Sequence, residues 1–448
     1  MDILIKAAQF FMSLSILVIL HEAGHYAAAK YFGTRVEKFY LFFDWKFSLF
    51  KFRKGETEYG IGWIPLGGYV KISGMIDESM DTDQMANEPQ PWEFRSKPAW
   101  QRLIILLGGV TVNFLLAMVI YIGIMFVWGE KYLPNENLKD GVWVVDSLAT
   151  NMGFQNGDKI VSINDNKIER FSGIMPEMIY GGVVQVIREN GEKRNIEVPN
   201  NFIETLIDKE NRQLFMYRMP FIVSKVVEES QNIDIGLLPK DIIVSLNGDE
   251  VKYFDEFSAM AKELAGEEVE LGIRRNGNSK TLTANISEDG KLGVLSGSLN
   301  LIELEKLGYY QLEVHEYGLL ESIPKGINKA LKQMSDYFRQ LKLIFNPSTG
   351  AYKGVGGFAS IGNLFPPVWD WQIFWSMTAF LSIMLGVLNL LPIPALDGGH
   401  AMFTIYEMLT GKKPNDKFME HAQLIGILLL LSLFLFANGM DAYKGFFK

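Results

Sequence analysis

The sequence predicts a membrane protein whose four transmembrane helices carry a soluble, β-rich insert. Three observations support this fold class. Four segments are apolar over about 20 residues or more, which is the length of helix that crosses a bilayer. Between the second and third segments lies an acidic stretch that alternates polar and apolar residues as soluble domains do. Within that stretch a short motif occurs twice, which indicates two similar domains.

Composition excludes several classes of function. The chain has 448 residues, of which 48% are hydrophobic and 21% charged, and its net charge is −9. Residues 130–322 hold 20 basic and 33 acidic side chains, a net −13, whereas the rest of the chain sums to +4. Nothing is strongly basic, so no nucleic-acid partner is expected. The absence of cysteine excludes disulfides, cysteine-ligated zinc, iron–sulfur clusters and thiol catalysis.

The four predicted spans are long apolar runs. They are Lys6 to Lys30, Leu103 to Trp128, Trp371 to about Leu391, and Ala422 to Met440. No signal-peptide cleavage pattern follows the first run, so we expect it to remain in the membrane. Ten basic residues lie near the span ends on one side and six on the other, a bias that places both termini and the insert outside the cytoplasm.

A further helix is predicted between Ile323 and Phe345, before the third span. Its apolar residues recur at spacings of three and four, and basic residues occupy the opposite face. Such a helix lies either in the membrane interface or on the surface of the insert. Its position before a membrane span favours the interface, where the lipid bilayer is its partner.

The first span contains His21-Glu22-Ala-Gly-His25 within its apolar run. On a helix, histidines four residues apart lie on one face, so both imidazoles can hold one metal ion. Glu22 then lies close enough to take a proton from an attacking water. The alternative is a pair of core histidines satisfied by their neighbours. A charged side chain in a span costs about 2.5–3.5 kcal/mol, and a divalent cation supplies the compensation that three ionisable groups need.

The third span ends in Asn389-Leu-Leu-Pro-Ile-Pro-Ala-Leu-Asp397-Gly-Gly-His400, where two prolines and two glycines break a helix at membrane depth. Irregular backbone is tolerated there only where it lines an enclosed or watery cavity. The alternative is an ordinary turn at a helix end. Catalytic zinc commonly has three protein ligands and one open position. Asp397 offers an oxygen and His400 a nitrogen, and composition alone leaves both as candidates for the third ligand.

Together these motifs resemble the site-2 proteases, the intramembrane zinc metalloproteases, and in particular the bacterial regulator-of-sigma-E protease branch. HEAGH and NLLPIPALDGGH occur in the family's order, as do ETEYGIGWIPLGGYVKISG, GGVTVNF and GVGGFASI. The resemblance implies that Zn²⁺ is bound by His21, His25 and Asp397. It also implies that Glu22 is the general base and that Asn389 holds the substrate backbone near the metal.

Between the first two spans, residues 56–73 predict a β-hairpin that turns at Pro65-Leu-Gly67-Gly68. It is either an ordinary surface hairpin or, as the resemblance implies, a membrane-reentrant β-loop whose edge pairs with an unwound substrate strand. Gly67, Gly68 and Tyr69 are therefore candidate substrate-binding residues.

The insert contains an internal repeat. Asp158-Lys-Ile-Val-Ser-Ile-Asn164 recurs as Asp241-Ile-Ile-Val-Ser-Leu-Asn247, with five of seven residues identical. The turns before the two copies resemble the GLxxGD turn of PDZ domains, with Lys240 in place of the glycine in the second copy. PDZ-like domains either bind peptides along a sheet edge or act only as spacers. The family resemblance implies that they shield the active site from large substrates.

The predicted organisation has five parts. They are transmembrane helices one and two with HExxH and the β-loop (1–129), two PDZ-like domains (130–217 and 218–310), a linker with the interfacial helix (311–370), and transmembrane helices three and four with the LDG motif (371–448).

The predicted function is that of an intramembrane zinc metalloprotease in the bacterial inner (cytoplasmic) membrane. Its expected substrates are single-span membrane proteins already cleaved outside the membrane, such as anti-sigma-factor-like regulators, or remnant signal peptides. One alternative is a non-catalytic scaffold, against which Glu22 argues because a scaffold needs no base. Another is a transport pathway, for which the expected inverted repeat of broken helices is not apparent.

Overall fold

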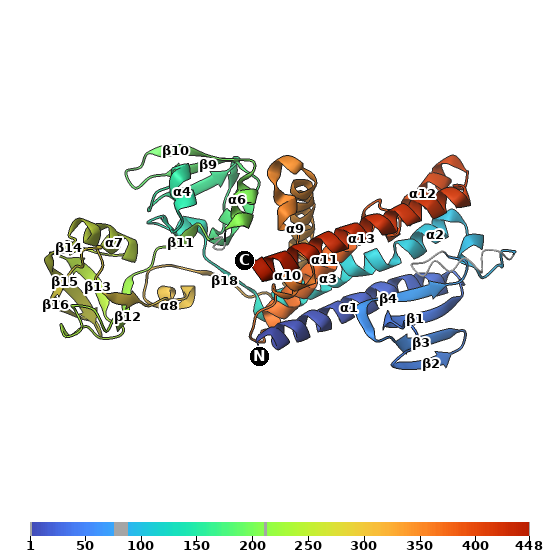
Figure 1. The fold of residues 1–448 in the computed structure, drawn as a ribbon, viewed down its shortest axis with the longest axis horizontal. Coiled ribbons are helices and arrows are strands. Elements are labelled where there is room, and N and C mark those ends of the chain that lie inside the picture. Colours follow the sequence, from blue (N-terminus) through green and yellow to red (C-terminus); the bar gives the residue numbers. More distant parts are fainter. Residues whose placement is uncertain (1, 76–87, 210–212, 448) are drawn as a thin grey trace. The chain divides into compact units, whose positions relative to one another are not determined.

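The computed structural model describes residues 2–75, 88–209 and 213–447, which form two units (Figure 1). The membrane unit comprises Met1–Gly129, Glu316–Phe345 and Gly354–Lys448. The insert unit comprises Glu130–His315 and Asn346–Lys353. Among the described residues, four helices are long and apolar enough to cross a membrane, as expected, and all four belong to the membrane unit.

These four helices are α1 (Asp2–Tyr31), α3 (Gly108–Trp128), α11 (Trp371–Leu390) and α13 (Asp416–Phe447). The second predicted span began at Leu103, but the chain there forms a separate helix, α2 (Ala99–Leu106), and α3 begins after Leu107. The junction between α2 and α3 lies against α1. A Cβ on Gly108 would lie 2.6 Å from the carbonyl oxygen of Gly24, so the two glycines allow the backbones to meet.

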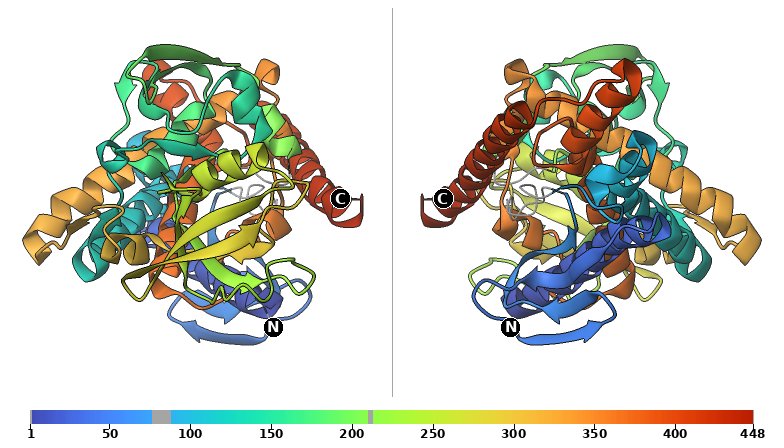
Figure 2. Two further views of the ribbon diagram at one scale, coloured as in Figure 1. Left: turned by 90° about the vertical axis from the view of Figure 1, so that its left-hand side faces the viewer. Right: turned by 90° about the vertical axis from the view of Figure 1, so that its right-hand side faces the viewer.

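A four-stranded sheet follows α1 and lies alongside it (Figures 1 and 2). Its strand order is β2–β3–β1–β4, and its strands are β1 (Val36–Phe43), β2 (Phe50–Lys54), β3 (Thr57–Ile61) and β4 (Ile64–Ile72). β4 pairs antiparallel with β1, and its other edge has no strand partner among the described residues.

The predicted turn at Pro65–Gly68 is wrong. These residues lie inside β4, and the hairpin is instead formed by β2 and β3, which pair antiparallel. Gly68 serves close packing and not a turn, because a Cβ there would lie 2.6 Å from Cγ1 of Val18 on α1 and 2.8 Å from the carbonyl oxygen of Tyr40.

The membrane unit also contains α9 (Leu319–Phe345), α10 (Phe358–Gly362), α12 (Asp397–Thr410) and the 3-10 helix η2 (Phe94–Ser96). α9 packs on α3 and α11 and runs steeply across α3 (Figure 1). The expectation that this helix lies in the membrane interface stays a prediction, but the alternative, a helix on the surface of the insert, is wrong. Its buried face contains small residues, and a Cβ on Gly326 would lie 2.4 Å from the Ile122 nitrogen.

The apolar stripe predicted for α9 lies beside this buried face and is partly exposed. Ile323, Leu331 and Phe338 are each about 40% exposed (39%, 43% and 41%). Leu341 of the stripe is buried, and the other buried residues of α9 are Ser322, Gly326, Ala330 and Tyr337. A small residue such as Gly326 allows the backbones of α9 and α3 to approach closely.

The insert unit has two hydrophobic cores, each beneath its own sheet. The first sheet has the order β10–β9–β7–β8, beside the pair β11–β6. Its elements are η3 (Asn135–Asn137), β6 (Val142–Val144), α4 (Ser147–Met152), β7 (Lys159–Ile163), β8 (Asn166–Lys167), η4 (Phe171–Gly173), α5 (Ile174–Met178), β9 (Gly182–Ile187), β10 (Lys193–Val198), α6 (Phe202–Asp208) and β11 (Phe215–Tyr217).

The second sheet has the order β16–β15–β13–β12–β17, with β14 paired to β13. Its elements are β12 (Phe221–Val226), β13 (Ile242–Leu246), β14 (Asp249–Glu250), α7 (Phe254–Glu263), β15 (Glu268–Arg275), β16 (Asn278–Asn285) and β17 (Val294–Ser296). The remaining elements of the unit are the pair β5 (Glu130–Tyr132) and β18 (Glu313–His315), α8 (Leu301–Lys306), η5 (Pro347–Thr349) and η6 (Ala351–Gly354).

The sequence repeat corresponds to equivalent turns in the two domains. Gly157 (φ +83°) and Lys240 (φ +75°) both adopt the left-handed conformation before strands β7 and β13. The carboxylates that follow, Asp158 and Asp241, each accept a backbone N–H at 2.8 Å, from Gln155 and Leu238 respectively. The lysine therefore keeps the turn that the glycine forms in the first copy.

Candidate metal centre

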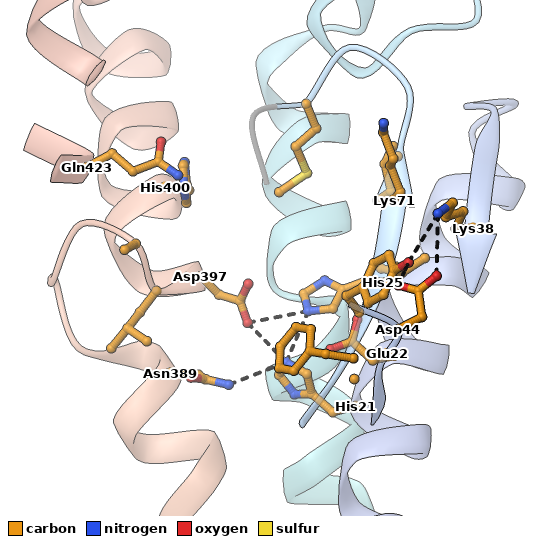
Figure 3. A pocket seen from close by; sticks show the side chains of 18 of the residues that line it. His21, Glu22, His25, Lys38, Asp44, Lys71, Asn389, Asp397, His400 and Gln423 are labelled. Atoms are coloured by element: carbon orange, nitrogen blue, oxygen red, sulfur yellow. Dashed lines mark hydrogen bonds and ion pairs between the residues drawn. The ribbon is translucent and has the colours of Figure 1, made fainter. Parts of the chain in front are cut away.

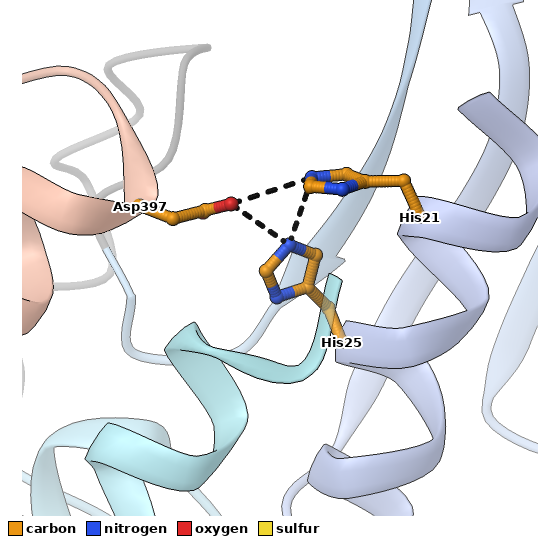
Figure 4. A group of neighbouring side chains, drawn as sticks. All are labelled: His21, His25 and Asp397. Atoms are coloured by element: carbon orange, nitrogen blue, oxygen red, sulfur yellow. Dashed lines mark hydrogen bonds and ion pairs between the residues drawn. The ribbon is translucent and has the colours of Figure 1, made fainter. Parts of the chain in front are cut away.

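Two helices bring the predicted metal ligands together. His21 and His25 lie on one face of α1 and are 7% and 5% exposed. α11 ends at Leu390, the proline-containing stretch that follows is not helical, and α12 begins at Asp397. Proline removes a backbone donor and clashes with a continuing helix, so the break occurs where the sequence predicts it. Asp397 therefore projects from the first residue of α12 toward α1 (Figure 4).

Three donor atoms form a nearly equilateral triangle. Nε2 of His21 lies 3.2 Å from Nε2 of His25, and each of these nitrogens lies 3.3 Å from Oδ2 of Asp397 (Figure 4). His400 lies one turn further along α12 and lines the same cavity, but the metal-ligand group formed by the described residues contains Asp397 and not His400.

The triangle has the dimensions of a zinc site. Ligand atoms about 2.0–2.1 Å from zinc stand about 3.3–3.4 Å apart in a tetrahedron, and two histidines with one carboxylate are a known catalytic ligand set. Oδ2 of Asp397 is buried and accepts no hydrogen bond within the described part of the chain. A Cβ on Gly109 would lie 2.4 Å from Nε2 of His25 and 2.7 Å from Nε2 of His21, so glycine leaves space beside both imidazoles. These residues fit a zinc ion.

The second nitrogen of each imidazole also has a partner. Nδ1 of His25 lies 2.9 Å from the carbonyl oxygen of Ile105, to which it donates. Its Nε2 therefore keeps a free electron pair facing the other donors. Nδ1 of His21 lies 3.0 Å from Nδ2 of Asn113 on α3. Sequence reasoning did not single out Asn113, although one signal was present: a lone amide in an otherwise apolar span.

The group lies in a cavity of about 540 Å³ formed by the membrane unit (Figure 3). Glu22 and Asn389 line it, and Nδ2 of Asn389 lies 3.3 Å from Nε2 of His21. Of the predicted residues on β4, Gly68 and Tyr69 also line the cavity. Gly67 lies beside the ring of Phe43, where an added Cβ would lie 3.1 Å from the ring.

The sheet contributes charged as well as apolar side chains to the cavity wall. The Tyr69 hydroxyl donates to Asp44 at 2.9 Å, and Lys38 lies 3.7 Å from the same carboxylate (Figure 3). Lys71 pairs with Glu37 at 3.6 Å. The cavity wall therefore contains polar groups beside the metal ligands, as a site for hydrolysis at membrane depth requires.

Comparison with known proteins gives consistent similarities. Residues 9–433 match peptidase family M50. The chain is 28% identical over 475 residues to the regulator of sigma E protease of Haemophilus influenzae, with 98% of each chain covered. It is 27% identical over 466 residues to protease RseP of Yersinia pestis, with 97% of each covered. A Rickettsia conorii protein whose name includes the words zinc metalloprotease is 27% identical over 96% of this chain and 97% of its own.

Proposed function

The chain belongs to peptidase family M50, and from this premise we propose that it is an intramembrane zinc metalloprotease acting on transmembrane segments of single-span membrane proteins. The observation that carries the proposal is the buried triangle of His21, His25 and Asp397, which is built between helices of the membrane unit. Zinc is the metal in the names of relatives, and the donor set fits it.

The side chains around the triangle have distinct roles. Zinc held by His21, His25 and Asp397 would polarise the scissile carbonyl and lower the pKa of the attacking water. Glu22 takes the proton from that water and passes it to the leaving amine. The Asn389 amide is positioned beside His21 to donate a hydrogen bond to the substrate backbone, which holds the scissile bond at the site.

The outer edge of β4, which has no strand partner among the described residues, is the proposed binding surface for the substrate. Peptide hydrolysis needs an unwound segment, because the carbonyls of an intact helix are hydrogen-bonded within it. An extended segment can add to a sheet edge through main-chain hydrogen bonds. Gly68 and Tyr69 of β4 line the cavity, and Gly67 lies in the same strand, so a segment on this edge lies next to the metal ligands.

The protein is a multi-pass protein of the bacterial inner (cytoplasmic) membrane, and we place both termini and the insert on its extracytoplasmic side. α1 begins and α13 ends at the same end of the membrane unit, opposite the β1–β4 sheet (Figure 1). The excess of basic residues near the other span ends assigns the sheet end to the cytoplasm. The partly exposed apolar stripe of α9 supports an interfacial position for this helix, in contact with lipid.

The two β-rich domains of the insert are proposed to be PDZ-like filters. Their matching turns before β7 and β13 support a common fold. A filter of this kind admits membrane proteins whose outer part has already been cut off, such as trimmed anti-sigma-factor-like regulators or remnant signal peptides.

The test is cleavage of one single-span substrate in reconstituted vesicles, in two forms: one with a short outer tail and one with a large folded outer domain. We expect mass spectrometry to locate a cut within the span of the short form and little cutting of the long form. Cuts only outside the span would contradict intramembrane proteolysis. Equal cutting of both forms within the span would leave the protease assignment intact and remove the filter.

A further inference from the structure

Asn113 has an incomplete set of hydrogen bonds in the middle of the membrane unit. The residue is fully buried on α3, and its Nδ2 lies 3.0 Å from Nδ1 of His21. Its Oδ1 is buried and has no hydrogen-bond partner among the described residues. Its main-chain oxygen accepts a hydrogen bond of 2.7 Å from Ser382 of α11, which fixes the position of α3 at this residue.

The tautomer of His21 explains why an amide stands here. A neutral imidazole carries one proton, so a histidine that binds metal through Nε2 carries its proton on Nδ1. That N–H then needs an acceptor. His25 has one, because the Ile105 carbonyl can only accept. For His21 the neighbouring atom is the Nδ2 donor of Asn113, which suits only an unprotonated Nδ1.

Nδ1 of His21 faces the amide of Asn113, and its Nε2 lies 3.3 Å both from Oδ2 of Asp397 and from Nδ2 of Asn389. A neutral imidazole carries one proton, so the end that the Asn113 amide presents to Nδ1 decides which ring nitrogen carries it. A half-turn of the amide exchanges its donor and acceptor ends with little change of shape. Oδ1, now without a partner, would then accept from Nδ1–H and leave Nε2 free for metal.

We propose that Asn113 is a positioning residue that selects the metal-binding tautomer of His21 by presenting its amide oxygen to the Nδ1–H. This inference rests on the proposed metal site, but it concerns metal affinity and not the chemical step. An amide serves both tautomers, whereas a carboxylate would serve only the metal-binding one. Partners that orient a ligand histidine commonly contribute about 10–100-fold in metal affinity.

The test measures zinc affinity by chelator competition in the full-length protein and in three variants. Asn113→Leu keeps the approximate size and removes both hydrogen-bonding ends. Asn113→Asp keeps an acceptor for Nδ1–H. The matched control is Thr378→Val on α11, since Thr378 is equally buried and its hydroxyl donates to the Phe374 carbonyl in its own helix. The imidazole ¹⁵N shifts of His21 in the zinc-loaded proteins report the tautomer directly.

We expect Asn113→Leu to bind zinc about 10–100-fold more weakly. Asn113→Asp and Thr378→Val should stay within a few-fold of wild type, and the His21 proton should lie on Nδ1 in wild type and in Asn113→Asp. Wild-type affinity in Asn113→Leu would overturn the inference, as would an equal loss in Asn113→Asp, because packing alone would then explain the residue. Absence of zinc binding by the wild-type protein would instead contradict the proposed function.

Discussion

Two buried groups of ionisable side chains, one in each unit, are satisfied in opposite ways. In the insert unit, the guanidinium of Arg218 is almost fully buried and donates to Asp255, Glu256 and Glu189 and to the Asp140 carbonyl. In the membrane unit, two imidazoles converge on Oδ2 of Asp397, which accepts no hydrogen bond from any described residue. The hydrogen bonds of the first group are satisfied by protein groups alone, whereas the second group presents a donor set that can bind a cation.

The electrostatics of the Arg218 group agree with a structural role. Burial alone would lower the pKa of Arg218, but the hydrogen bonds to Asp255 and the charges of Glu256 and Glu189 raise it above its ordinary value. Arg218 follows the last strand of the first domain, Glu189 belongs to that domain, and Asp255 lies on α7 of the second. Buried charge in the insert therefore holds two domains together, whereas buried charge in the membrane unit is available for chemistry.

Glu22→Gln is the variant with the largest expected effect. The base is lost, so cleavage of a single-span substrate should fall by about 10²–10⁴-fold, while zinc content stays unchanged because His21, His25 and Asp397 remain. The measurements are cleavage rate and zinc per chain. The matched control is Glu37→Gln, since this carboxylate pairs with Lys71 on the sheet and has no proposed role in the reaction. Turnover near the wild-type rate in Glu22→Gln would remove Glu22 from its role.

Arg218→Met should give the converse result. It leaves the buried Asp255 carboxylate without its partner, which costs about 3–5 kcal/mol, and the loss should be confined to the insert. Hydrogen exchange of the β11 and β12 amides measures that loss, and zinc content should not change. The control Lys225→Met removes an exposed pair with Glu228, expected to contribute at most about 1 kcal/mol. Zinc loss in Arg218→Met, or an effect no larger than the control's, would break the comparison.

Lys240→Gly should have the smallest effect. The left-handed conformation of Lys240 costs a non-glycine residue about 1–2 kcal/mol, and the freedom of glycine in the unfolded chain offsets part of the gain. We expect the second domain to become more stable by up to about 1 kcal/mol, measured as a shift in unfolding midpoint, with zinc content unchanged. A decrease in stability would mean that the lysine side chain contributes more than its backbone strain costs.

Features that depend on local composition could be predicted from the sequence. The apolar runs matched the four long helices, because bilayer thickness sets the length of a span. The break after the third span falls where two prolines prevent a continuous helix. The spacing of His21 and His25 places both on one face of α1, because that face repeats every three to four residues.

Features that depend on contacts between distant segments could not be predicted in the same way. The sequence predicts a turn at Gly68, but this residue is a point of close approach to α1. Nothing in the neighbouring sequence distinguishes a turn glycine from a close-packing glycine. The break at Leu107 lies beside the meeting point of Gly24 and Gly108, which are 84 residues apart in the chain. The role proposed for Asn113 depends on its contact with His21, which lies 92 residues away in the chain. For α9, the small residues Gly326 and Ala330 share the buried face with Tyr337 and Leu341, whereas Leu331 and Phe338 are partly exposed.

The central claim is that Asp397, and not His400, completes the metal site with the two histidines of α1. The most direct measurement is zinc per chain in purified Asp397→Asn and His400→Ala beside the wild-type protein. We predict about one zinc per chain in the wild-type protein and in His400→Ala, and a large loss in Asp397→Asn, because Asp397 presents a donor 3.3 Å from both imidazole nitrogens and the metal-ligand group found among the described residues does not contain His400. Full zinc in Asp397→Asn together with its loss in His400→Ala would contradict the account.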